Sequence, residues 1–127
     1  MPDRKRVEEF IRMVVSGDHV RAIEDFYRED ASMRENTKEP RRGRDVLVAH
    51  EAAALKRMAR IHTHQPEIFL VDGDRVAINW TFDITDGEGV TRRMEELALQ
   101  RWRGERIAEE RFFYDPASIQ PVAVQPG

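Results

Sequence analysis

The chain has 127 residues, 40% of them hydrophobic and 8% aromatic, which is enough for one domain with a single core. Its 21 Lys and Arg residues nearly balance 24 Asp and Glu residues, so the net charge of −3 offers no broad positive field for nucleic acid or an anionic membrane. Cysteine is absent, which excludes disulfides, thiolate catalysis and cysteine-ligated zinc. No apolar run reaches the ~18 residues of a membrane span, and MPDRKR is not followed by the apolar core of a signal peptide, so we expect a cytoplasmic protein.

The N-terminal part of the chain has the periodicity of two short helices. A first helix is predicted over residues 4–16, before the sequence Ser-Gly-Asp, and its apolar face is Val7, Phe10, Ile11, Val14 and Val15. We expect Asp18 to cap a second helix by accepting a hydrogen bond from a backbone N–H of its first turn. The predicted buried stripe of that helix is Val20, Ile23, Phe26 and Tyr27.

A short strand and a third helix follow. Alternation around Met33 predicts a strand over residues 31–36, and KEPRRGR has the composition of a polar loop. The helical period then returns over residues 46–59, with Asp45 as the expected cap. The shared face of this helix is Val48, Ala52, Leu55 and Ala59.

The second half of the chain consists of alternating segments separated by turn dipeptides. The segments are IHTHQPEIFLV, RVAINWTFDIT, VTRRMEELALQRWR and RIAEERFFYD. They predict an antiparallel meander of long strands, and helices followed by such a sheet are typical of the α+β class. We expect one domain over residues 1–116 and a C-terminal tail over 117–127, either an ordered arm or disordered.

This order of elements resembles the nuclear-transport-factor-2-like (NTF2-like) superfamily, and within it the SnoaL-like polyketide cyclase and ketosteroid isomerase branches. The resemblance covers residues 4–116 and lies in SGD, FYREDASM, VDGDRVAINW and GERIAEERFFYDP. It implies a cone in which three N-terminal helices pack on a curved antiparallel sheet and enclose an apolar pocket. It also implies a homodimer that forms through the convex side of the sheet.

Strand parity decides which side chains would enter that pocket. In RVAINWTFDI the apolar residues Val76, Ile78, Trp80 and Phe82 alternate with polar ones and should face the helices. In the last strand the alternating residues Glu110, Phe112 and Tyr114 match the cavity positions of the isomerase branch.

The strand over residues 93–103 is open to two registers. Composition alone favours burial of Leu97 and Leu99. Aligning Trp102 with the family's aromatic residue before the final turn instead turns the other set inward, which is Met94, Glu96, Ala98, Gln100 and Trp102. A change of one residue in the turn at Gly104 flips every side chain, so turn length leaves both registers open, and we adopt the family's.

The adopted register predicts a cavity with few polar groups among aromatic ones, which is the composition of a small-molecule site. Its polar members are Glu96, Glu110, Gln100 and Tyr114, and its aromatic members are Trp80, Phe82, Trp102 and Phe112. Two carboxyl groups buried together should raise at least one pKa and permit acid–base chemistry near neutral pH. The alternative is that both glutamates pair with arginines or histidines and brace the sheet.

The known chemistries of the resembling families fit only in part. Glu35 matches the base of ketosteroid isomerase, whereas Phe10 and Ala98 occupy the positions of its two oxyanion donors, so steroid isomerisation is not expected. Asp115 could match the acid of SnoaL-like cyclases, but Asp before Pro is also an ordinary turn starter. His62 and His64 point the same way and could be an acid–base pair or two ligands of a metal. A third ligand is not evident, so we predict no metal.

We therefore predict a protein that binds a small, largely apolar organic molecule without a cofactor, as a homodimer and with no nucleic acid or membrane partner. Two classes stay open. One is an isomerase, cyclase, dehydratase or hydrolase with Glu96, Glu110 and Tyr114 as catalytic residues. The other is a non-catalytic binding or accessory module that uses the same cavity. The expected ligand contacts are Trp80, Phe82, Gln100, Trp102, Phe112, Glu35 and His64.

Overall fold

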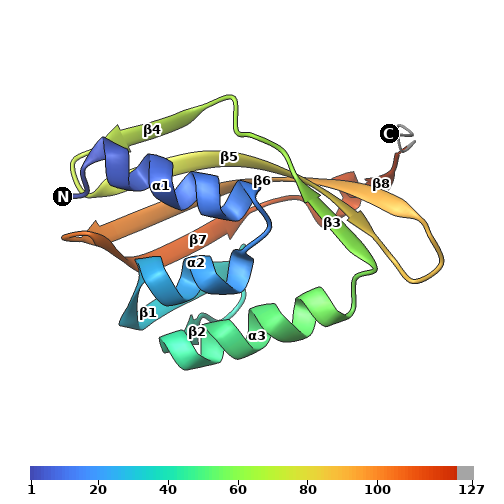
Figure 1. Cartoon of the computed structure of the whole chain (residues 1–127), viewed down its shortest axis with the longest axis horizontal. Coiled ribbons are helices and arrows are strands. Elements are labelled where there is room, and N and C mark those ends of the chain that lie inside the picture. Colours follow the sequence, from blue (N-terminus) through green and yellow to red (C-terminus); the bar gives the residue numbers. More distant parts are fainter. Residues whose placement is uncertain (123–127) are drawn as a thin grey trace.

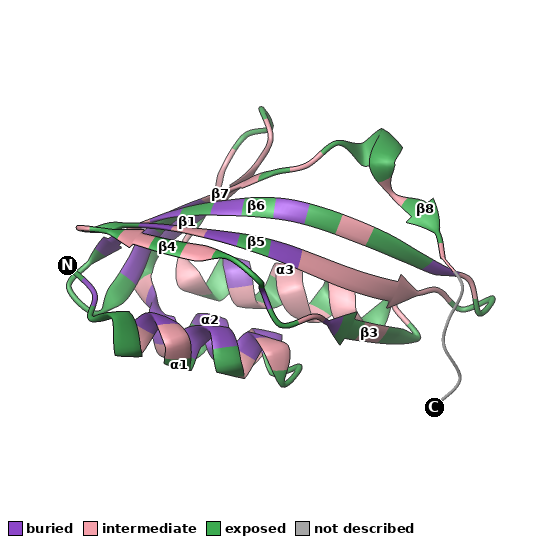
Figure 2. Cartoon of the chain, turned by 90° about the horizontal axis from the view of Figure 1, so that it is seen from above, coloured by how far each residue is buried: buried purple, intermediate pink, exposed green. Residues whose placement is uncertain are grey.

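The computed structural model describes residues 1–122, so the end of the predicted tail, residues 123–127, lies outside the described residues. Three helices lie against one face of a curved sheet (Figures 1 and 2). The helices are α1 (Arg4–Val15), α2 (His19–Phe26) and α3 (Arg44–Lys56). The strands are β1 (Tyr27–Glu35), β2 (Arg41–Arg42), β3 (Arg60–Thr63), β4 (Phe69–Asp72), β5 (Arg75–Thr85), β6 (Thr91–Arg103), β7 (Arg106–Phe113) and β8 (Gln120–Pro121). The α+β class is confirmed.

The first two helices form where the periodicity predicts them, but the capping of their N-terminal ends differs from the prediction for α2. Asp3 caps α1 by accepting a hydrogen bond from the Lys5 N–H, and the face of α1 with Val7, Phe10, Ile11 and Val14 is buried. In α2 the prediction for Asp18 was wrong, because its side chain makes no capping hydrogen bond. The buried residues of α2 are His19, Ala22, Ile23 and Phe26.

The chain becomes extended directly after Phe26, so Tyr27 is the first residue of β1 and does not belong to the helical stripe. Tyr27 is buried, whereas Val20, which we expected in the stripe, is only partly buried. Strand β1 is also longer than the predicted strand over 31–36.

The third helix begins earlier than predicted, at Arg44, with Gly43 as its N-cap and no side-chain cap. Gly43 has a φ of 96°, a conformation that favours glycine, and Asp45 lies within the first turn. Only Leu47 of this helix is buried. The predicted face through Ala59 does not form a core stripe, because α3 packs against α2, β1 and β2 and part of its inner surface faces a pocket.

The sheet has the strand order β2-β1-β7-β6-β5-β3, with β4 paired to β5 and β8 paired to β6. The pair β1 and β7 is parallel, so the sheet is mixed and the prediction of a purely antiparallel sheet was wrong. The segment IHTHQPEIFLV forms two strands, β3 and β4, which pair with opposite ends of β5. Pro66 lies between them, and proline has no N–H to continue a strand ladder.

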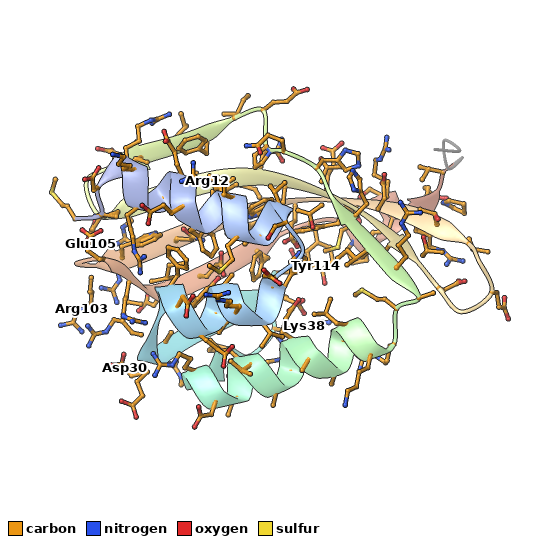
Figure 3. The ribbon with its side chains drawn as sticks, in the orientation of Figure 1. Arg12, Asp30, Lys38, Arg103, Glu105 and Tyr114 are labelled. Atoms are coloured by element: carbon orange, nitrogen blue, oxygen red, sulfur yellow. The ribbon has the colours of Figure 1, made fainter. Side chains whose placement is uncertain are left out.

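A bulge sets the register of the last two long strands. Gly104 and Glu105 form a two-residue turn, with Arg103 opposite Arg106 and Trp102 opposite Ile107. The register then shifts by one residue, so that Arg101 lies opposite Glu109 and Gln100 opposite Glu110. Without this bulge Glu109 would face the helices in place of Glu110. Arg103 and Glu105 project from the turn at the end of the sheet (Figure 3).

Burial along β6 follows the register adopted from the family. Glu96, Ala98, Gln100 and Trp102 are buried, whereas Leu97 is 44% exposed and Leu99 42% exposed on the convex face. Buried and exposed segments alternate along β6 (Figure 2). On β5 the inward set is Val76, Ile78, Trp80 and Phe82, as predicted. Strand β8 pairs with Arg92 and Arg93 of β6, beyond the point where β7 ends. No helix of the described residues is long and apolar enough to cross a membrane.

Candidate functional site

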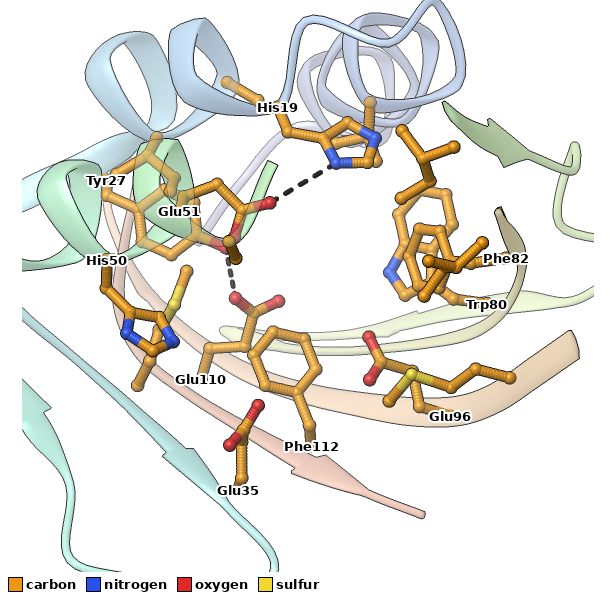
Figure 4. Close-up of a pocket in the computed structure, with 18 of the residues that line it drawn as sticks. His19, Tyr27, Glu35, His50, Glu51, Trp80, Phe82, Glu96, Glu110 and Phe112 are labelled. Carbon is orange, nitrogen blue, oxygen red and sulfur yellow. Dashed lines mark hydrogen bonds and ion pairs between the residues drawn. The ribbon is translucent and has the colours of Figure 1, made fainter. Parts of the chain in front are cut away.

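A cavity of about 210 Å³ lies between the concave face of the sheet and the three helices. Most of its wall is apolar, and the rings of Trp80 and Phe82 stack on one side with their centroids 5.8 Å apart (Figure 4). Phe10, which the sequence resemblance matched to an oxyanion donor of the isomerase branch, is part of this wall. An apolar cavity with a few polar groups is the usual form of a small-molecule site.

Half of the polar side chains in the lining are acids, and separate elements contribute them. They are Glu35 of β1, Glu51 of α3, Glu96 of β6 and Glu110 of β7. The basic side chains of the lining are Arg41, His19 and His50. Because each acid comes from a different element, the fold and not one local motif assembles the cluster.

Glu110 is held by a buried chain of hydrogen bonds. The Tyr27 hydroxyl donates to its Oε1, and the Gln100 Nε2 donates to its Oε2 at 2.6 Å. The Trp102 Nε1 in turn donates to the Gln100 Oε1 at 2.9 Å. Burial raises the pKa of Glu110 to about 7, while the two donated hydrogen bonds act in the opposite direction. The carboxyl group is therefore fixed in orientation and titrates near neutral pH.

Glu96 has a different environment. It is 9% exposed and its carboxyl group faces the cavity (Figure 4). Burial raises its pKa to about 8, and the nearby charges of Glu110, Glu35 and Glu51 act in the same direction. No hydrogen bond contributes to this shift, and within residues 1–122 we find no donor or cation paired with the group. Glu96 is thus a buried acid available to a bound molecule.

Most of the remaining polar groups of the cavity form pairs, except His50, for which we find no hydrogen bond or ion pair within residues 1–122. The His19 Nδ1 lies 3.4 Å from the Glu51 Oε1, and its Nε2 lies 2.9 Å from the Thr63 hydroxyl. Arg41 forms an ion pair with Glu35, with 3.6 Å between Nη2 and Oε2. These pairs leave Glu96 as the carboxyl group of the cavity that lacks a partner among the described residues.

Six of the ten predicted site residues line the cavity, and they are Glu35, Trp80, Phe82, Glu96, Glu110 and Phe112. Gln100 and Trp102 lie behind the wall, where they support Glu110. Tyr114 is not among the lining residues; it follows the end of β7 and its backbone N–H donates to the Asn36 side chain. The prediction that these residues share one cavity wall with Trp80 was therefore wrong for Gln100, Trp102 and Tyr114.

The two strand histidines lie apart from the cavity lining. The His64 Nε2 is 2.8 Å from Asp83, whose carboxylate is also bound by Arg93 at 2.9 and 3.1 Å. His62 packs against His64, with ring centroids 4.6 Å apart. Among the described residues no group of three or more His, Cys, Asp or Glu side chains could hold a metal ion.

Asp115 has the structural role that its sequence context allows. Its side chain accepts a hydrogen bond from the Ala117 N–H at the start of a 3-10 turn, Pro116–Ser118, and it is exposed. The residue does not line the cavity. The structure therefore shows Asp115 as a turn-capping residue outside the cavity lining.

Sequence reasoning missed Tyr27, His19 and Glu51 as members of the site. All three lie in segments with helical periodicity, where an apolar or amphipathic residue is most simply assigned to packing. Nothing in the spacing shows that β1 begins at Tyr27 and runs parallel to β7, the arrangement that brings its hydroxyl to Glu110.

The comparisons with known proteins agree with this architecture. The SnoaL-like domain family matches residues 7–110. A candidate SnoaL-like polyketide cyclase from Mesorhizobium loti superposes with a TM-score of 0.75 over 90% of this chain and 100% of that chain, at 23% identity. The search of curated proteins found no match to this sequence.

Two further solved structures share the fold and carry small organic molecules. TerC, co-crystallised with polyporic acid, has a TM-score of 0.77 at 14% identity and covers 93% of this chain and 95% of its own. A protein with a ketosteroid isomerase-like fold from Catenulispora acidiphila, in complex with trimethylamine, has a TM-score of 0.72 at 18% identity and covers 84% of this chain and 83% of its own. At these identities the likeness shows the NTF2-like fold alone.

Proposed function

This chain belongs to the SnoaL-like domain family, and we propose that its cavity is a cofactor-free acid–base site for a small, largely apolar organic molecule. Glu96 is the group that accepts and returns the proton. The reaction class is proton transfer at a carbon next to a carbonyl group, as in an isomerisation, a cyclisation or a dehydration.

The single observation that carries this proposal is the state of Glu96. A carboxyl group that faces an apolar cavity without a partner, and whose pKa lies at about 8, has both its protonated and its ionised form populated near neutral pH. Groups with such pKa values are concentrated at functional sites. A glutamate that only braced the sheet would have a cationic partner, as Glu109 has in Arg101 at 2.9 Å.

Glu110 has a supporting role in this proposal. Its two oxygens are occupied by Tyr27 and Gln100, so it has a fixed orientation and can position a substrate or accept a hydrogen bond through its remaining lone pairs. Tyr114 is not assigned a chemical role, because it lies outside the lining.

The test is hydrogen exchange at carbon, with Glu95→Gln as the matched control because Glu95 is exposed on the opposite face of the same strand. Two model ketones in D₂O, neutral 4-phenylbutan-2-one and cationic 5-(diethylamino)pentan-2-one, would be followed by NMR for loss of the α-proton signal. The wild-type chain and Glu95→Gln should accelerate exchange of at least one ketone. Glu96→Gln should be slower by about 100-fold or more. Equal rates for the two variants, or no acceleration at all, would reject the catalytic role.

A non-catalytic binding module is the second candidate, and one observation favours it. The positions of the isomerase oxyanion donors are held by Phe10 in the wall and by the buried Ala98, neither of which can donate a hydrogen bond to an enolate. The same cavity would then bind a molecule without converting it. The exchange experiment separates the two candidates, because a binding module accelerates neither ketone.

We also propose that the protein forms a homodimer through the convex face of the sheet. Leu97 and Leu99 of β6 and Phe113 of β7 are 44%, 42% and 38% exposed there. Leu97 lies directly opposite Phe113 in the strand ladder, so the residues form one patch. A contiguous exposed apolar patch of this kind marks an interaction surface.

A further inference from the structure

The acids of the cavity outnumber the cations that are free to balance them. Among the lining residues the only guanidinium is that of Arg41, and it is paired with Glu35. His19 is placed between Glu51 and Thr63. His50 also lines the cavity, but among the described residues no ion pair joins it to the other two acids. Glu96 and Glu110 therefore have no cationic partner within residues 1–122, and burial favours their protonated forms.

The partnerless carboxyl group lies beside an aromatic face. Trp80 is directly opposite Glu96 in the pairing of β5 with β6, and both side chains are on the concave side of the sheet. The indole stacks on Phe82 with an angle of 24° between the ring planes, which extends the aromatic surface (Figure 4). A carboxylate next to an aromatic face is the combination that attracts an ammonium group, because both the charge and the ring quadrupole favour a cation.

Three classes of ligand can be compared on these grounds. An anionic ligand would be repelled by every carboxylate of the cavity. A neutral ligand would leave Glu96 without a countercharge when it ionises. A cation would supply the missing countercharge and lower the cost of ionising Glu96. The large apolar part of the wall requires that the cation be attached to an apolar body.

We infer that the natural ligand carries a cationic nitrogen on an apolar body, and that the ammonium group binds between the Glu96 carboxylate and the indole of Trp80. This inference rests on the proposed function, because it concerns the same cavity, and it adds the substrate class. The bound cation also converts Glu96 to its carboxylate form, which is the form that accepts a proton.

The pH dependence of binding follows from the groups that face Glu96. They are Glu35 and Tyr27 of β1, Arg41 of β2, His19 of α2, His50 and Glu51 of α3, and Glu110 of β7. A cation prefers the ionised carboxyl group, so its affinity should rise with pH and its binding should release a proton. Histidine also titrates in this range, so the variant Glu96→Gln, which keeps both histidines, is needed to isolate the carboxyl group.

The experiment is calorimetric titration with benzyltrimethylammonium, whose charge does not depend on pH, in buffers of different ionisation enthalpy. For the wild-type chain and for Glu95→Gln, affinity should increase about tenfold between about pH 6 and about pH 9, with release of up to about one proton. In Glu96→Gln the affinity above pH 8 should fall about tenfold and most of the proton release should disappear. Neutral 4-phenylbutan-2-one and anionic phenylacetate serve as matched probes without a positive charge.

The outcomes separate this inference from the proposed function. Binding of the ketone or phenylacetate as tight as that of the cation, or a cation affinity that does not rise with pH, would overturn the assignment of an amine and leave the small-molecule site in place. The indole NMR signals of Trp80 provide a second measure of binding. If they stay unchanged and calorimetry shows that none of the probes binds, both the amine assignment and the small-molecule site are rejected. Loss of cation binding in Glu95→Gln as well as in Glu96→Gln would equally overturn the assignment to the cavity.

Discussion

The Tyr27 hydroxyl donates a hydrogen bond to the Glu110 carboxyl group, although 83 positions separate the two residues in the chain. The contact exists because β1 runs parallel to β7 and because the bulge in β7 turns Glu110 toward the helices. Gln100 binds the other oxygen of Glu110. Glu110 is therefore held in place by two donors, whereas Glu96 in the same cavity has none among the described residues. We expect this difference to be measurable.

Replacing Tyr27 by Phe should raise the pKa of Glu110 above its value of about 7, because the Tyr27 hydrogen bond stabilises the ionised form. The expected change is roughly one unit. Carboxyl-carbon NMR across a pH titration measures it. Tyr114→Phe is the control, since Tyr114 is not among the lining residues and should leave the Glu110 titration unchanged. An equal shift in both variants would mean that the hydrogen bond is not the cause.

Replacing Gln100 by Leu should destabilise the fold. The variant removes the donor to Glu110 and the acceptor for the Trp102 indole N–H, so two buried polar groups lose their partners. Each unsatisfied buried group costs about 1–3 kcal/mol, so we expect the two together to lower the free energy of unfolding by about 2–6 kcal/mol. Urea denaturation measures this change. Gln65→Leu, at an exposed position, should change stability by less than about 0.5 kcal/mol. A similarly small loss for Gln100→Leu would show that water satisfies the network.

The carboxyl pair also predicts how stability depends on pH. In the folded chain Glu96 and Glu110 keep protons up to pH values of about 8 and about 7, whereas their ordinary pKa is 4.5. The folded state therefore binds more protons than the unfolded state between these values, so the free energy of unfolding should fall as pH rises from 4.5 to about 8. Arg93 lowers the pKa of Asp83 from 3.8 to about 2. Asp83 therefore makes the free energy of unfolding rise with pH, but only between these two more acidic values.

Glu96→Gln should make that decline smaller and should be more stable than the wild-type chain above about pH 8. Each unit of pKa difference corresponds to about 1.4 kcal/mol, so the gain should reach a few kcal/mol. Denaturant titrations at several pH values measure the effect. The exposed control Glu95→Gln should follow the wild-type curve. A wild-type stability that rises from pH 5 to pH 8 would show that Glu96 is ionised and paired in the folded chain.

Sequence periodicity was sufficient to identify the buried face of an element where that face is uniformly apolar. On β5 the alternation of Val76, Ile78 and Trp80 with polar residues identified the buried face correctly. Strand β6 was different, since its buried face includes Glu96 and Gln100 and its exposed face includes Leu97 and Leu99. Composition alone would invert that strand, and only the family resemblance gave the correct register. A functional cavity and an apolar outer surface both violate the pattern on which such reasoning depends.

The sequence predicted which side chains of a single strand face the cavity, but not which groups of other strands they contact. Glu110 was placed inward correctly, but its partners Tyr27 and Gln100 depend on a parallel strand pair and on a bulge. Neither feature has a local sequence signal as strong as a turn dipeptide. For the same reason Tyr114 was assigned to the cavity by alternation, although β7 ends at Phe113 before that alternation can continue.

The convex patch gives the last prediction, which concerns assembly. If Leu97, Leu99 and Phe113 form the interface, light scattering at micromolar concentration should give twice the chain mass of 14.9 kDa. Leu97→Arg places a charge at the centre of the patch, opposite Phe113, and should yield the monomer with the fold intact by circular dichroism. Val46→Arg is the matched control, because Val46 is 50% exposed but lies on α3, away from the convex face. A wild-type chain that is monomeric at these concentrations, or a dimer that survives Leu97→Arg, would rule out this interface.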